Sequence, residues 1–323
     1  MRRQIAALVA GLSLLAAAMI TALPAQAAYP GRDGKIAYVR ESGTSRDIWT
    51  INTDGTGNRR LTFDGRSWHP RWSPDGKLVA FERSRDIYIM TAAGQLVRRV
   101  TRTGRAHQPT WSPDGRRIAF INVLPNGRGD IYTVAATGGA ITRLTRDAAT
   151  TCGNDRPTWS PLGTTILYHQ RTGAACDLDR ILLVTISTRA KRLVTQDGAV
   201  NPRDQVANPD FAADGRHLVF MAYCESSDPY SCGGNSLNPV VSDLQGLNRR
   251  FLVVAAGAEG DDSLFEVAAA PDGQNAVVVG HTWGGYYPEY QGSVMRLVPS
   301  YSLVLFMDDS VGRIRQPDWQ PLP

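Results

Sequence analysis

Two histidines are the residues best placed for chemistry in this sequence. His69 and His107 each lie three or four residues before a tryptophan, in segments of matching pattern. Two imidazoles and a nearby carboxylate can bind a divalent metal. A metal held by His69 and His107 is therefore one hypothesis, although the other histidines are scattered and we expect no cofactor. Those other histidines are His169, His217 and His281.

The usual catalytic patterns are missing from the sequence. No Gly-x-Ser-x-Gly nucleophile turn, His-Glu-x-x-His zinc pair or glycine-rich phosphate loop occurs. The acidic pairs Asp261-Asp262 and Asp308-Asp309 are typical of solvated loops. The sequence therefore favours a protein that is not an enzyme.

Four cysteines can pair in three ways, and their spacing favours one pairing. Cys224 and Cys232 share a short polar segment that a disulfide would close as a small loop. Cys152 and Cys176 then pair across a strand-turn-strand unit. The alternative, a metal site, lacks the Cys-x-x-Cys or histidine spacing that such sites need. We predict two disulfides and therefore an oxidising compartment.

An aromatic segment between 281 and 292 is a second candidate site. Four aromatic residues occur there among Gly and Pro, which disfavours a regular strand. Aromatic rings with polar edges suit sugars and protein partners alike. They can equally cap a weakly packed part of the fold, and both interpretations remain open. The four residues are Trp283, Tyr286, Tyr287 and Tyr290.

A recurring turn must position these residues. Trp72-Ser73-Pro74-Asp75-Gly76 returns as Trp111-Ser112-Pro113-Asp114-Gly115 and, altered, as Trp159-Ser160-Pro161-Leu162-Gly163. Ser, Pro, Asp and Gly suit successive positions of a tight turn, and apolar residues follow each copy. Weaker copies surround Asp33-Gly34, Asp214-Gly215 and Asp272-Gly273. Six units follow, 39 to 58 residues apart.

Each of the first three units contains a second recurring motif, here called the Asp-Ile-Tyr motif. Its copies are Asp47-Ile48-Trp49, Asp86-Ile87-Tyr88 and Asp130-Ile131-Tyr132. Alternating apolar residues there predict a half-buried strand. A polar turn and a fourth strand follow, and no helical pattern appears. Four strands at this period predict an all-β propeller of four-stranded blades.

The two ends of the chain complete this prediction. Arg2, Arg3 and an apolar run before Ala25-Gln26-Ala27 indicate a signal peptide over 1–27, with the propeller over 28–323. An uncleaved membrane anchor is the alternative, and no later segment is apolar enough to span a membrane. Gln316-Pro317-Asp318-Trp319 matches the start of a repeat. We predict a six-bladed propeller closed by this C-terminal strand joining the first blade.

The sequence resembles the propeller of the TolB family in three motifs. These are the repeated Pro-x-Trp-Ser-Pro-Asp-Gly, the Asp-Ile-Tyr motif and the terminal Asp318-Trp319-Gln320-Pro321. The resemblance covers 28–323 and does not include the smaller N-terminal domain of TolB. It implies the fold more strongly than the activity. Similar propellers occur beside serine-peptidase domains and in metal-using polysaccharide lyases.

Aligned three residues before the tryptophan position, the six units define a ring of polar residues. In such propellers the tryptophan strand lines the central channel, so this ring is expected at the channel mouth, on the face of the long loops. A hydrated channel alone would explain the polarity, whereas the alternative is a binding site. The members are His69, Gln108, Arg156, Asn208, Glu266 and Gln316.

Charge and composition narrow the expected partners. The net charge is +5, and loss of Arg2 and Arg3 with the signal leaves +3 without a basic cluster, so nucleic acid is not expected. We expect a monomer, secreted to the periplasm or cell exterior, that binds a protein or cell-envelope polymer through its loop face. The alternative is a metal-assisted extracellular carbohydrate lyase or hydrolase acting at the channel mouth.

Overall fold

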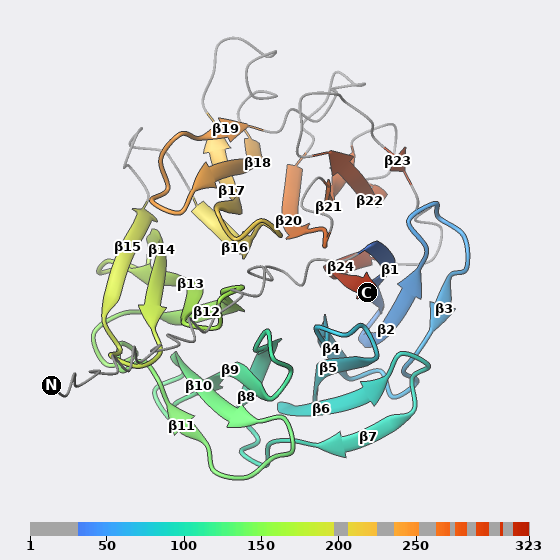
Figure 1. Cartoon of the computed structure of the whole chain (residues 1–323), viewed down its shortest axis with the longest axis horizontal. Coiled ribbons are helices and arrows are strands. Elements are labelled where there is room, and N and C mark those ends of the chain that lie inside the picture. The colour runs from blue at the N-terminus through green and yellow to red at the C-terminus, as the bar shows by residue number, and fades with distance from the viewer. Residues whose placement is uncertain are drawn as a thin grey trace, which may run out of the picture.

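The computed structural model describes residues 32–196, 206–224, 236–251, 263–271, 275–282, 289–296, 304–305 and 313–322. In this part of the chain, strands β1 to β24 form six four-stranded antiparallel sheets. Figure 1 shows the sheets arranged side by side in a ring around a central axis. The chain is a β-propeller.

Five of the sheets, here called blades 1 to 5, are each made of four consecutive strands. Blade 1 contains β4 (Ser67–Trp72), β5 (Leu78–Arg83), β6 (Asp86–Thr91) and β7 (Leu96–Arg99). Blade 2 contains β8 (Ala106–Trp111), β9 (Arg117–Val123), β10 (Gly129–Ala135) and β11 (Thr142–Arg143). Blade 3 contains β12 (Gly153–Trp159), β13 (Thr165–Thr172), β14 (Leu178–Thr185) and β15 (Lys191–Gln196).

The last two contiguous blades follow the same order. Blade 4 contains β16 (Val206–Phe211), β17 (His217–Cys224), β18 (Ser236–Asp243) and β19 (Arg250–Phe251). Blade 5 contains β20 (Ser263–Ala269), β21 (Asn275–Thr282), β22 (Glu289–Arg296) and β23 (Val304–Leu305).

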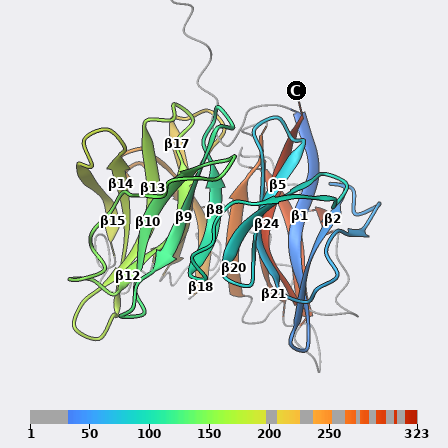
Figure 2. The same cartoon turned by 90° about the horizontal axis from the view of Figure 1, so that it is seen from below.

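The remaining sheet is composite and is called the closing sheet. It pairs β24 (Arg313–Leu322) with β1 (Arg32–Ser42), followed by β2 (Ser45–Ile51) and β3 (Arg59–Arg60). The antiparallel register places Ile36 opposite Trp319 and Arg40 opposite Ile314. The two ends of the chain therefore meet in one sheet, which Figure 2 shows from the side.

The prediction of six blades is corrected by this arrangement. It counted the first repeat unit, around Asp33-Gly34, as a blade. That unit has no innermost strand of its own, so β1 to β3 complete a sheet only with β24 from the other end of the chain. The structure shows five blades and a closing sheet, and the predicted closure by the C-terminal strand is confirmed.

The recurring turns explain why the repeats pack at a regular spacing. Ser73 donates to Asp75 at 2.6 Å, and the same contact recurs in blade 2. Gly76 has a φ of 66°, and a Cβ there would lie 2.1 Å from the Pro321 carbonyl oxygen. Only glycine therefore tolerates both the backbone conformation and the close neighbour. Each turn is shaped to fit against the turn of the preceding sheet.

The aspartate of the Asp-Ile-Tyr motif is buried and accepts several hydrogen bonds on the third strand of blades 1 and 2. Asp130 is fully buried and accepts bonds from Thr145 and Arg143. It also accepts the backbone N–H groups of Asp147 and Ala148, which begin the connection to blade 3. This aspartate thus joins the third strand, the fourth strand and the next connection, which its repetition in the sequence could not reveal.

Candidate functional site

The predicted ring residues share an unusual backbone conformation. His69, Gln108, Arg156, Asn208 and Gln316 have positive φ values, between 48° and 55°. Each precedes a proline and interrupts the pairing of the innermost strand as a bulge, for example between Trp68 and Arg71. A bulge redirects a side chain, and a left-handed conformation is costly for a residue with a Cβ. The equivalence of the ring positions is thus conformational as well as positional.

Four of the six ring residues line one cavity between the innermost strands β4, β8, β12 and β24, and this end of the ring is here called the mouth. The cavity measures ≈ 30 Å³, room for about two waters. Asn208 is buried and does not line this cavity, whereas the Glu266 side chain lies outside the described residues. The four are His69, Gln108, Arg156 and Gln316.

Glutamines of the ring hold the adjacent ring backbone in place. The Gln316 side-chain oxygen accepts the His69 backbone N–H at 2.8 Å, and Gln108 does the same for Arg156. The Gln316 amide nitrogen therefore donates to Nε2 of His69, 2.7 Å away. In this orientation Nε2 of His69 accepts a hydrogen bond and Nδ1 carries a proton.

Glu82 joins the two histidines of the metal hypothesis. Its two carboxylate oxygens accept from Nδ1 of His69 and Nδ1 of His107, each at 2.9 Å. Glu82 is 6% exposed, and this burial by itself would raise its pKa. The hydrogen bonds from His107 and His69 outweigh burial and lower the pKa of Glu82 to about 2. The carboxylate is therefore ionised at neutral pH.

This arrangement gives no support to a metal at His69 and His107. Nδ1 of both histidines is directed at Glu82, and Nε2 of His69 is directed at Gln316. Across the described ranges, no group of three or more His, Cys, Asp or Glu side chains could hold a metal. The donor atoms contact one another in place of a central ion.

A second network at the mouth, in blade 3, has the opposite charge pattern. His169 lies between Asp155, 2.7 Å from Nδ1, and Asp179, 2.8 Å from Nε2. Burial alone would lower the pKa of His169, but the hydrogen bonds to these two aspartates raise it to about 9. His169 is therefore a buried cation at neutral pH.

Glu82 and His169 occupy the same place in their blades. Each follows the buried aromatic residue of the second strand, Phe81 or Tyr168, and pairs with the residue before the ring position. Sequence reasoning missed Glu82, Asp155 and Asp179 as members of the mouth. The alignment used for the ring, extended to the second strand, would have found the shared position of Glu82 and His169.

Below the mouth, tryptophans narrow the channel. Trp72, Trp111, Trp159 and Trp319 line a second cavity of ≈ 30 Å³ together with charged residues. Arg71 donates to Asp318 at 3.1 Å, and burial raises the pKa of Asp318 to about 6 despite that arginine. Among the described residues, the two channel cavities are far smaller than the ≈ 300 Å³ or more of a site that encloses a drug-sized ligand.

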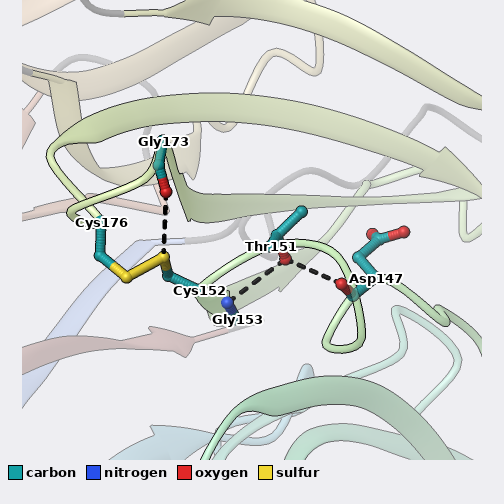
Figure 3. The surroundings of a disulfide bond; sticks show 6 residues. All are labelled: Asp147, Thr151, Cys152, Gly153, Gly173 and Cys176. Atoms are coloured by element: carbon teal, nitrogen blue, oxygen red, sulfur yellow. Dashed lines mark hydrogen bonds between the residues drawn. A yellow bond between two sulfur atoms is a disulfide. The ribbon is translucent and has the colours of Figure 1, made fainter.

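The disulfide between Cys152 and Cys176 is present and lies beside the second network. Its Cα atoms are 5.6 Å apart. Figure 3 shows that it links the connection entering β12 to the loop between β13 and β14, where Cys152 Sγ also contacts the Gly173 carbonyl. Asp155 and Asp179 each follow a bridged cysteine by three residues.

Other predicted sites fall outside the described side chains. Cys232, Trp283, Tyr286 and Tyr287 are not among the described residues. Cys224 ends β17 and Tyr290 pairs with His281 through the backbone, but their side chains are also outside the description. The second disulfide and the aromatic surface stay predictions.

Comparison with known proteins identifies the family. The TolB beta propeller domain family matches residues 26–230. The chain belongs to this family. No curated protein matches the sequence. Among the described residues, no helix is long and apolar enough to cross a membrane.

Solved structures resemble the fold at low sequence identity. TolB from Acinetobacter baumannii is 22% identical with a TM-score of 0.65, over 89% of this chain and 67% of that one. A protein from Agrobacterium tumefaciens assigned to TolB is 18% identical with a TM-score of 0.61, over 90% and 100%. The propeller domain of the Trilobed protease from Pyrococcus furiosus, described as an open velcro topology, is 12% identical with a TM-score of 0.54, over 87% and 97%. At the coarse level, this is a TolB-like propeller, a fold that supports protein binding.

Proposed function

We propose that this chain is an exported, non-catalytic propeller that binds a protein or cell-envelope polymer across the channel mouth. The observation that carries the proposal is the mouth itself. Its four ring side chains are polar and joined by hydrogen bonds to their neighbours, yet the cavity between them admits only about two waters. Such a surface suits a partner that docks over it better than a small ligand enclosed within it.

The fixed positions favour recognition because little order must be gained on binding. Gln108 and Gln316 accept hydrogen bonds from the backbone of the neighbouring ring residues, and Glu82 accepts hydrogen bonds from two histidines. Preorganised groups lose less conformational entropy when a partner binds. Arg156 contributes a guanidinium, a group common at the centre of protein interfaces.

Export is part of the same proposal. The segment 1–27 has the pattern of a signal peptide, and the disulfide between Cys152 and Cys176 suits an oxidising compartment. Both features support a periplasmic or extracellular location.

The proposal is tested by placing a photo-crosslinking amino acid at Gln108, with Lys77 on the opposite, turn-bearing face as the matched control. After irradiation of the native cells, capture from position 108 but not 77 is expected. Capture from 77 alone, or equally from both, would contradict a mouth-directed partner.

The hypothesis of a metal-assisted carbohydrate lyase or hydrolase makes a different prediction. It requires stoichiometric metal that is lost on replacing His107 by Ala. Elemental analysis of the purified protein and of this variant would detect such a metal, and its presence would favour the enzyme.

A further inference from the structure

A groove lies between blades 3 and 4, on the face formed by the Ser-Pro-Asp-Gly turns. It is separate from the two channel cavities. The cavity measures ≈ 340 Å³, within the range of small-molecule sites. Blade 3 contributes Leu162, Thr165 and Leu183, and blade 4 contributes Phe211 and Leu244. This groove is far larger than either channel cavity.

Small residues at two equivalent positions create the groove. In blade 1, Leu78 packs against the cluster that contains Trp111 of blade 2. In blade 2, the Arg117 guanidinium lies 4.9 Å from the centre of the Trp159 ring of blade 3. At the next interface the corresponding residues are Thr165 and Phe211, and both are smaller. Space that a large side chain fills at the two preceding interfaces is left open here.

A third difference from the repeat, at the turn aspartate, changes the polarity of the groove edge. Asp75 and Asp114 each accept a bond from the serine of their own turn. The residue at this place in blade 3 is Leu162, which is 68% exposed and lines the groove. The substitution removes a negative charge and adds an apolar surface that would gain from being covered.

The charged residues of the groove are basic. Lys191 and Arg192 belong to its lining, and the lining contains no carboxylate. Lys191 pairs with Asp147, whereas Arg192 donates from Nη2 to the Leu244 carbonyl at 2.7 Å. A guanidinium has five N–H donors, so Arg192 can bind an anion while keeping this bond.

We propose that the groove binds a small amphiphilic carboxylate. Its hydrocarbon arm lies against Leu162, Leu183 and Phe211, and its carboxylate meets Arg192. The site lies on the opposite face from the mouth and does not depend on the function proposed there.

The experiment measures binding of octanoate, far below its micellar concentration, by calorimetry with the folded protein. Octanol supplies the arm without the charge, and acetate supplies the charge without the arm. Octanoate is expected to bind at least tenfold more tightly than either. Binding of acetate or octanol as tight as that of octanoate would overturn the proposal.

Variants then assign the site. Leu162→Asp restores the residue of the other turns, and Thr165→Leu restores the residue found in blade 1. Each is expected to weaken octanoate binding at least tenfold, whereas Arg192→Gln should weaken octanoate but leave octanol unchanged. Phe63 is an exposed residue of the connection from β3 to β4, so Phe63→Asp is the matched control and should have no effect.

Leu162→Asp changes the charge of the groove, whereas Thr165→Leu reduces its volume. Melting curves establish that each variant folds. Unchanged octanoate binding in either folded variant would overturn the proposal. An equal loss in Phe63→Asp would show general adsorption to apolar surface and would also overturn it.

Discussion

The two polar networks at the channel mouth have opposite charge at the same position. In blade 1 an anion, Glu82, is held by two histidines, whereas in blade 3 a cation, His169, is held by two aspartates. Both central groups are nearly buried. A buried charge is tolerated when hydrogen-bond partners surround it, and either sign meets that condition. At these two equivalent positions the local partners decide the sign of the charge.

The networks also differ in how their partners are held. The partners of Glu82 come from two inner strands, β4 and β8, in adjacent blades. The partners of His169 come from β12 and β14 of its own blade, each close to a bridged cysteine. The first network therefore joins blades, and the second depends on a covalent link within one blade.

Removal of the disulfide should have the largest effect and should separate the networks. In the Cys152→Ala, Cys176→Ala double variant, loss of a cross-link spanning 24 residues is expected to cost about 3.5 kcal/mol of unfolding free energy. Urea unfolding measures this cost. The pKa of His169, followed by NMR, should fall as Asp155 and Asp179 lose their fixed positions. An unchanged His169 pKa would show that the network does not need the disulfide.

Replacement of Glu82 by Gln should destabilise the protein at neutral pH and have less effect in acid. The folded pKa of about 2 lies below the ordinary value of 4.5, so this carboxylate stabilises the protein above pH 4.5 and less as the pH falls toward 2. The variant should lose about 2–3 kcal/mol at pH 7, with the deficit shrinking through that window. Unfolding measured from pH 7 to 2 provides the comparison. A deficit independent of pH would contradict the assigned ionisation.

Replacement of His169 by Gln should have a smaller effect, present near pH 6 and lost in alkali. The folded pKa of about 9 exceeds the ordinary 6.5, so the charged form stabilises the protein fully below pH 6.5 and less as the pH rises through 9. A deficit of about 2 kcal/mol is expected at pH 6, and it should shrink by pH 9.5. A deficit that stays the same from pH 6 to pH 9.5 would contradict the assigned charge of His169.

The recurring turn and strand motifs of the sequence predicted much of the fold correctly. A turn of Ser, Pro, Asp and Gly has few alternative conformations, so its recurrence fixed the period and the strand directions. The match of Trp319 to the repeat tryptophans predicted the closure. The blade count was wrong, because it included the first unit, which has no innermost strand of its own.

The candidate site was predictable only in part. The structure places four residues of the aligned ring, His69, Gln108, Arg156 and Gln316, at one cavity, whereas Asn208 is buried and does not line it. The alignment gave no hint of the left-handed backbone that five of the ring residues share. At His69 and Arg156 this backbone is held by a glutamine of the neighbouring sheet, 48 or more residues away in the sequence.

The sequence by itself determined the repeat, the strands, the closure and the pairing of Cys152 with Cys176, because each depends on short patterns or on regular spacing. The tertiary structure alone decided what the polar residues do. It joined two histidines of the metal hypothesis to Glu82, made His169 a cation and opened a groove beside Leu162. These outcomes depend on burial and on contacts between blades, which no local pattern contains.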